Sequence, residues 1–220
     1  MAKPPLIKII IPILIVLLLG SAWNIGSRLF LPLANFDALL QHGIRAYSEG
    51  QIDQAFLRFQ DASEIRPNDA TTHYMLAQSL EAMGREDEAM EHYQQTIELN
   101  PAKAAPYYNL AVIYNRRKDL PAAESQLIEA LRQQRNFHGA RLMLGGIYHE
   151  QEKYEEAVDE LQRLLRNRDL ERPLEIRART FLARTYTAME ETQNAREQWQ
   201  KILQLDHTNE EAQEALSNLR

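Results

Sequence analysis

The sequence predicts an all-α protein, namely a solenoid of five helical hairpins with a C-terminal cap helix, preceded by one N-terminal transmembrane helix. Three observations lead to this prediction. Small, aromatic and turn residues recur with a spacing of 34 residues. The chain contains only 8 Gly and 9 Pro and is rich in Ala, Leu, Glu, Gln and Arg, which favour helix. Finally, residues 9–27 form an uncharged, strongly apolar stretch.

The segment 1–27 is predicted to be a membrane anchor. The 19 uncharged residues 9–27 would extend over roughly 28 Å as a helix, close to the hydrocarbon core of about 30 Å. Residues 28–35 are then a short linker. The alternative is a cleaved secretory signal, because the small residues 20–22 after the apolar run resemble a peptidase site.

The basic residues around the apolar stretch predict its orientation. Lys3 and Lys8 precede it, and only Arg28 follows closely. The positive-inside rule therefore favours a single-pass membrane protein with a cytoplasmic N-terminus. Residues 36–220 would then lie on the periplasmic, lumenal or outer side.

The charge of the chain is unevenly distributed. The 220 residues include 25 Lys and Arg against 31 Asp and Glu, a formal net charge of −6. Residues 1–35 contain three of the basic residues and no acidic one, so residues 36–220 carry a net charge of −9. This acidic body argues against a nucleic-acid partner, because phosphate binding needs clustered positive charge.

The repeat with a period of 34 residues predicts the architecture of the body, 36–220. Four pairs of residues share the spacing: Gly50 and Gly84, Ala55 and Ala89, Phe59 and Tyr93, Pro67 and Pro101. The Ala residues allow close helix approach, the aromatic residues fill the gap between hairpins, and each Pro ends a helix. The expected repeats are 36–69, 70–103, 104–137, 138–175 and 176–209, followed by a cap helix at 210–220. About four residues are inserted around 167–173.

These spaced residues resemble the tetratricopeptide repeat (TPR) family. The match rests on positions such as Ala55, Phe59 and Pro67, and it covers nearly all of 36–220. The resemblance implies two antiparallel helices, A and B, in each repeat. It also implies a concave groove, lined by the A helices, that binds a peptide or a helix of another protein.

The resemblance also implies which residues line the groove. They mix aromatic, Met, amide and Arg side chains, which are types enriched at protein interfaces. Some of them could instead pack on neighbouring repeats. The candidates are Tyr47, Tyr74, Met75, Gln78, Tyr108, Asn109, Val112, Asn115, Arg116, Leu142, Met143, Arg177, Phe181 and Arg184.

No motif in the sequence indicates catalysis. The six His residues show no metal-ligand spacing, and no phosphate-binding or nucleophile motif occurs. The absence of Cys excludes disulfides and thiol chemistry. His149 and Glu150 are expected to be a solvated polar pair. We therefore expect no enzyme activity, no metal, no cofactor and no small-molecule substrate.

An anchor joined to a binding groove predicts a membrane-tethered adaptor with a protein or peptide partner. Its expected role is the assembly or biogenesis of a membrane or envelope complex. Its layout resembles that of cytochrome maturation factors, translocon accessory proteins and photosystem assembly factors. The alternative is a permanent structural subunit of a secretion, pilus or photosynthetic machine. Small residues in the anchor, such as Gly20 and Gly26, would allow it to pack on other membrane helices.

Overall fold

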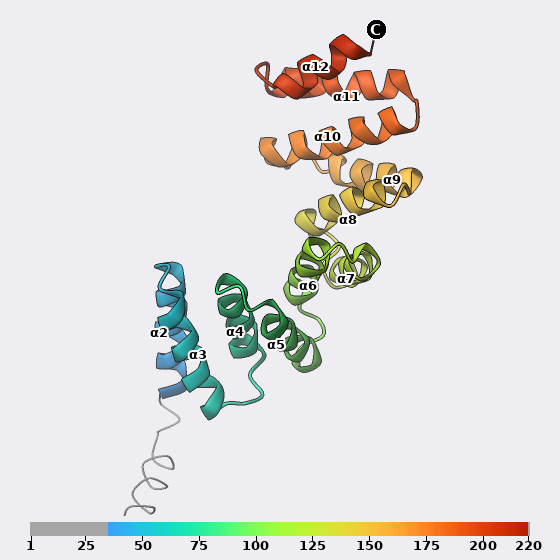
Figure 1. Cartoon of the computed structure of the whole chain (residues 1–220). Coiled ribbons are helices and arrows are strands. Elements are labelled where there is room, and N and C mark those ends of the chain that lie inside the picture. The colour runs from blue at the N-terminus through green and yellow to red at the C-terminus, as the bar shows by residue number, and fades with distance from the viewer. Residues whose placement is uncertain (1–34, 220) are drawn as a thin grey trace, which may run out of the picture.

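The computed structural model describes residues 35–219, and every regular element in this range is an α-helix (Figure 1). The predicted all-α solenoid is thus confirmed for this part of the chain. The predicted anchor, 1–27, lies outside the described residues, as does nearly all of the linker. No helix between residues 35 and 219 combines the length and apolar character needed to cross a bilayer. The helices are α2 (Phe36–Ser48), α3 (Ile52–Ile65), α4 (Ala70–Ala82), α5 (Glu86–Leu99), α6 (Ala104–Arg116), α7 (Leu120–Gln133), α8 (His138–Glu150), α9 (Tyr154–Leu165), α10 (Arg172–Ala188), α11 (Thr192–Leu205) and α12 (Glu210–Asn218).

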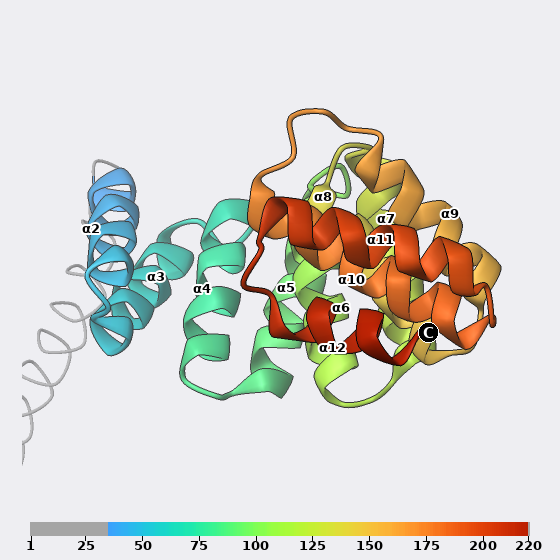
Figure 2. The same cartoon turned by 90° about the horizontal axis from the view of Figure 1, so that it is seen from above.

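The helices form a curved array in which each packs mainly on the helices before and after it in the chain. The A helices α4, α6, α8 and α10 line the inner side of the curve, and α5, α7 and α9 lie on its outer side (Figure 1). The last helix, α12, lies against α11 at the C-terminal end (Figure 2). This arrangement produces a continuous concave face built only from A helices.

The turn between helix A and helix B has the same form in all five hairpins. It has three residues, and the middle one has a positive φ of 61–77°. In the first hairpin, Gly50 N–H donates to the carbonyl of Tyr47, and Gln51 N–H to that of Ala46. This pattern is the Schellman motif, which caps the helix and reverses the chain. The middle residues are Gly50, Gly84, Lys118, Glu152 and Glu190.

Close packing inside each hairpin depends on small residues. The Ala at the equivalent position of each B helix is fully buried, namely Ala55, Ala89, Ala123, Ala157 and Ala195. Two A helices also have a Gly at the contact. A Cβ added to Gly43 would lie 2.5 Å from Phe59 Cε1, and one on Gly145 would lie 2.7 Å from Leu161 Cγ. A larger residue at either position would therefore push the two helices apart.

Helix α10 is longer than the other A helices. It has 17 residues, whereas α2, α4, α6 and α8 have 13 each. The residues that the repeat spacing marks as inserted form a longer loop, 166–171, and an additional first turn of α10. Pro173 lies within this first turn. It has no backbone N–H, but the N–H groups of a first turn have no acceptor within the helix, so no helical hydrogen bond is lost.

Candidate functional site

A hollow of about 170 Å³ opens on the concave face between α6, α8 and α10. We call it the concave hollow. All of its lining residues come from these three A helices, so it lies on the surface that the repeat pattern assigns to a partner. Six of the predicted groove residues line it: Tyr108, Asn115, Leu142, Met143, Arg177 and Phe181.

Apolar side chains form most of the wall of the concave hollow. Leu142 is only 3% exposed, since it also packs in the core between α8, α9 and α10. The ring of Phe181 lies against α8, because Gly146 has no side chain there. A Cβ on Gly146 would approach the ring to 3.3 Å. Tyr108 forms the opposite side, with its ring centroid 4.9 Å from that of Phe137.

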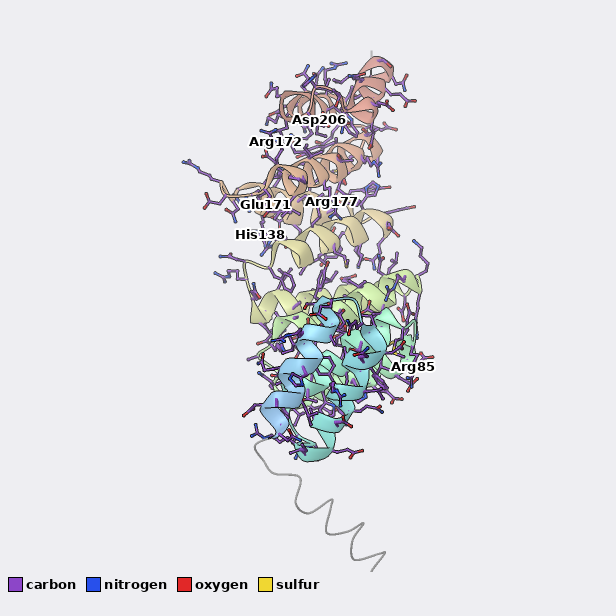
Figure 3. The ribbon with its side chains drawn as sticks, turned by 90° about the vertical axis from the view of Figure 1, so that its left-hand side faces the viewer. Arg85, His138, Glu171, Arg172, Arg177 and Asp206 are labelled. Carbon is purple, nitrogen blue, oxygen red and sulfur yellow. The ribbon has the colours of Figure 1, made fainter. Side chains whose placement is uncertain are left out.

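Three polar side chains line the concave hollow: Asn115, Arg177 and Glu150, whose carboxylate pairs with Lys118 at 3.4 Å. Arg177 is exposed and carries a positive charge, as Figure 3 shows on α10. The Oδ1 atom of Asn115 is buried and has no hydrogen-bond partner within the described part of the chain. An unpaired buried acceptor is destabilising, so a donor such as a peptide N–H would improve this site. The hollow thus combines an apolar surface with an amide acceptor, a cation and a carboxylate that is paired with Lys118.

A second group of predicted residues forms a hydrogen-bond network between the second and third hairpins. Asn109 Nδ2 donates to the Tyr93 hydroxyl at 3.0 Å and to the Tyr74 hydroxyl at 3.3 Å. Tyr93 in turn donates to Glu81 at 2.8 Å, and Arg116 donates to the same carboxylate at 2.7 Å. Burial, with Glu81 beside it, raises the pKa of Tyr93, so the phenol stays a neutral donor. The predicted residues Tyr74, Asn109 and Arg116 therefore hold adjacent hairpins together.

The remaining predicted residues do not line the concave hollow. Tyr47 and Met75 pack against the core of the first hairpin and α4. Gln78 on α4 and Val112 on α6 are half-buried. Arg184 pairs with Glu211 of the cap helix at 2.8 Å. A binding role for these residues stays a prediction.

The sequence prediction missed five residues that line the concave hollow, namely Gly139, Gly146, Ile147, Glu150 and Leu174. Gly139 occupies the second position of its repeat, which is a groove position. It was not predicted because it has no side chain that could contact a partner. Leu174 comes from the additional turn of α10, which the repeat spacing assigns to an insertion. Neither Gly could be recognised without knowing which ring packs beside it.

His149 is not the freely solvated residue that the sequence suggested. Its Nδ1 lies 3.1 Å from the Thr185 hydroxyl, and its ring lies 5.8 Å from that of Tyr154. Burial, and secondly the nearby Arg184, lower the pKa of His149. In residues 35–219, no three His, Asp or Glu side chains gather to form a metal site.

Two His rings join α4 to α5 within the second hairpin. His73 Nε2 lies 2.7 Å from the carbonyl oxygen of Pro67, which can only accept, so this nitrogen carries the proton. His73 Nδ1 then accepts from His92 Nδ1 at 3.0 Å. Burial, and secondly the adjacent His73, lower the pKa of His92, and the smaller effects of Gln95, Glu91 and Glu88 oppose this shift.

We expect the His pair to make stability depend on pH. His92 has a pKa below its ordinary 6.5 in the folded state, so its contribution to the free energy of unfolding is complete above pH 6.5. That contribution is lost as the pH falls through the folded value. Urea unfolding at pH values above and below 6.5 should show this loss in the wild type, and less of it in His92→Gln. Equal losses in both proteins would contradict the assignment. Part of the dependence of the unfolding free energy on pH should remain in His92→Gln, because the pKa of His149 is lowered too.

The curved array of helical hairpins and its concave face define a scaffold that binds other proteins. The comparisons identify the family: the chain belongs to the tetratricopeptide repeat proteins. The model of the cilia and flagella-associated protein 70 middle TPR-like domain matches residues 73–206, and a tetratricopeptide repeat model matches residues 46–96. Proteins of this family are typically interaction scaffolds and not enzymes. No curated protein matches the sequence.

Solved structures of TPR proteins have the same fold. MamA 41-end from Desulfovibrio magneticus RS-1 is 17% identical with a TM-score of 0.70, over 80% of this chain and 97% of that one. YrrB, described as a TPR protein with an unusual peptide-binding site, is 17% identical with a TM-score of 0.70. The match covers 81% of this chain and 90% of YrrB. PilF of Pseudomonas aeruginosa is 19% identical with a TM-score of 0.67, over 84% of this chain and 89% of PilF. At these identities the likeness extends to the fold alone.

Proposed function

We propose that this TPR protein is a membrane-tethered adaptor that holds a segment of a client protein in the concave hollow. Its role would be to assist the assembly of a membrane or envelope complex. The observation that carries the proposal is the concave hollow itself, with its apolar wall, the unpaired Asn115 Oδ1 and the exposed Arg177. Such a surface suits an extended or helical segment with apolar side chains, a free N–H and a carboxylate.

The tether rests on the sequence of residues 9–27, which has the length and apolar character of a membrane span. With the flanking basic residues, it supports a cytoplasmic N-terminus and a TPR domain on the opposite side of the membrane. N-terminal sequencing of the mature protein distinguishes this anchor from a signal peptide. A mature chain that begins at Trp23 would refute the tether.

The client site can be tested by photo-crosslinking in native membranes. A photoreactive residue replaces Met143, which lines the concave hollow, in the full chain. We expect a defined adduct that disappears with Arg177→Glu, because the reversed charge repels an acidic group of the client. Gly139→Trp should also abolish it by filling the hollow. A Cβ at Gly139 would lie 3.6 Å or more from its neighbours, so the new side chain can begin without a clash, and a thermal melt of the variant checks that the fold is kept.

Arg172→Glu is the matched control for this experiment. Arg172 is exposed at the start of the same helix and does not line the hollow (Figure 3). If the adduct survives both groove variants, or is lost equally in the control, the concave hollow is not the client site. An adaptor should associate with its client substoichiometrically and at one stage of assembly. Constant stoichiometric co-purification would instead favour a permanent subunit.

A further inference from the structure

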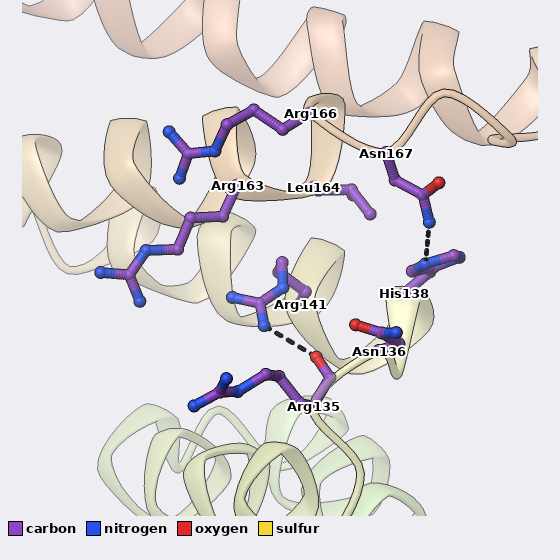
Figure 4. Close-up of a pocket in the computed structure, with 8 residues that line it drawn as sticks. All are labelled: Arg135, Asn136, His138, Arg141, Arg163, Leu164, Arg166 and Asn167. Carbon is purple, nitrogen blue, oxygen red and sulfur yellow. Dashed lines mark hydrogen bonds between the residues drawn. The ribbon is translucent and has the colours of Figure 1, made fainter.

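A second hollow, with a volume of about 320 Å³, lies where the loop before α8 meets the C-terminal end of α9. Four arginines line it, and we call them the arginine cluster: Arg135, Arg141, Arg163 and Arg166. In Figure 4 their guanidinium groups gather on one side of the opening. None of its lining residues belongs to the concave hollow, so the two are separate surfaces.

Two of the arginines are already paired with carboxylates of α9. Arg141 forms a largely buried ion pair with Glu160, and it donates to the Arg135 carbonyl oxygen at 2.9 Å. Arg163 pairs with Asp159 at 2.8 Å and with Glu160 at 3.2 Å. These contacts fix the positions of Arg141 and Arg163 in the wall of the hollow.

The other two arginines are not neutralised. Arg135 and Arg166 are exposed, and no acidic side chain within residues 35–219 forms an ion pair with either. Four guanidinium groups against the two carboxylates of Asp159 and Glu160 leave a local excess of two positive charges. This excess occurs in a body whose net charge is −9, so the patch stands out from its surroundings. Attraction between opposite charges would direct an anionic partner to it.

The shape of the hollow favours a peptide over a single small anion. A volume of about 320 Å³ corresponds to roughly ten water molecules, far more than one carboxylate or phosphate group fills. The exposed Asn136 offers an amide that can pair with a peptide backbone. Arginine forks bind carboxylates with two parallel hydrogen bonds.

We infer that the arginine cluster binds an acidic segment of a partner protein, with two carboxylates that pair with Arg135 and Arg166. The segment would lie across the hollow, with its backbone near Asn136. The protein then has two binding surfaces, one on the concave face and one beside the loops that join successive hairpins.

The test uses the full chain in non-ionic detergent and a fluorescent peptide of alternating Gly and Glu, blocked at both ends, at low ionic strength. We expect Arg135→Gln/Arg166→Gln to weaken binding by about tenfold or more, since both ion pairs are lost. The control Arg45→Gln/Arg58→Gln removes the same charge from exposed positions of the first hairpin and should stay within about twofold of wild type. All substituted side chains are exposed, so the thermal melts should coincide.

Three outcomes would overturn the inference. The first is an equal loss of affinity in the two double variants, which would indicate attraction to net charge alone. The second is equal binding of a peptide with Gln in place of Glu. The third is displacement by inorganic phosphate as effective as displacement by unlabelled peptide, because the hollow would then be a simple anion site. A failure of the photo-crosslinking at Met143 would leave this experiment unaffected, because the surfaces share no residue.

Discussion

Replacing Ala89 by Trp is expected to unfold the second hairpin and to lower the free energy of unfolding by about 3 kcal/mol or more. Ala89 is fully buried on α5 and lies in a cluster with Leu80 of α4 and Ile113 of α6. An indole at this position has no space unless α5 moves away from both neighbours. Such a movement would also break the contacts of the adjacent Tyr93, including its hydrogen bonds to Asn109 and Glu81.

Urea unfolding followed by circular dichroism measures this effect. Gln94→Trp is the control, because Gln94 is exposed on the same helix. The control should change the free energy of unfolding by less than about 0.5 kcal/mol. If Ala89→Trp unfolds at the same urea concentration as wild type, the packing between α4, α5 and α6 differs from that described here.

Replacing Phe59 by Ala is expected to lower the free energy of unfolding by about 3–5 kcal/mol. This is a large share of the total, which is roughly 5–15 kcal/mol for a typical domain. The Phe59 ring is fully buried, packs directly on the backbone of α2 at Gly43 and belongs to a cluster with Leu76 of α4. Gly43 has no side chain that could turn into the cavity. The cavity should therefore remain open, which makes the loss large.

Hydrogen exchange and urea unfolding together test this prediction. The amides of α2 should lose protection first, because the ring supplies a main contact between α2 and the rest of the array. Phe56→Ala is the control on the same helix. Its ring is only half-buried, so we expect a loss of roughly 1–2 kcal/mol. Comparable losses from the two substitutions would show that Phe59 is not the main contact.

The fold could be predicted from the sequence because the two helices of each hairpin pack in the same way and need the same residue types at their contact. Residues such as Ala55 and Ala89 are both fully buried at the closest helix contact, so their spacing reveals the period. The additional turn of α10 could not be predicted in the same way. An insertion found by spacing alone does not reveal whether its residues extend a loop or a helix.

The candidate site was harder to predict than the fold. The repeat pattern places residues such as Tyr108 and Asn109 on the concave face, but it does not reveal which of them bind each other. Asn109 contacts Tyr74, 35 residues earlier, because equivalent positions of adjacent repeats become neighbours in the array. Arg184 likewise pairs with the cap helix. These pairings depend on side-chain directions that the spacing alone does not determine.

The uniform turns between helix A and helix B have a consequence for how proteins of this design change in evolution. A three-residue connection with one left-handed residue has little room for a longer sequence, and Lys118, Glu152 and Glu190 keep this geometry even without Gly. The loops at the opposite edge have no such residue, and one of them, 166–171, is already longer than the rest. Natural length variation, and any epitope or reporter domain grafted by design, should therefore be tolerated at that edge, beside the arginine cluster.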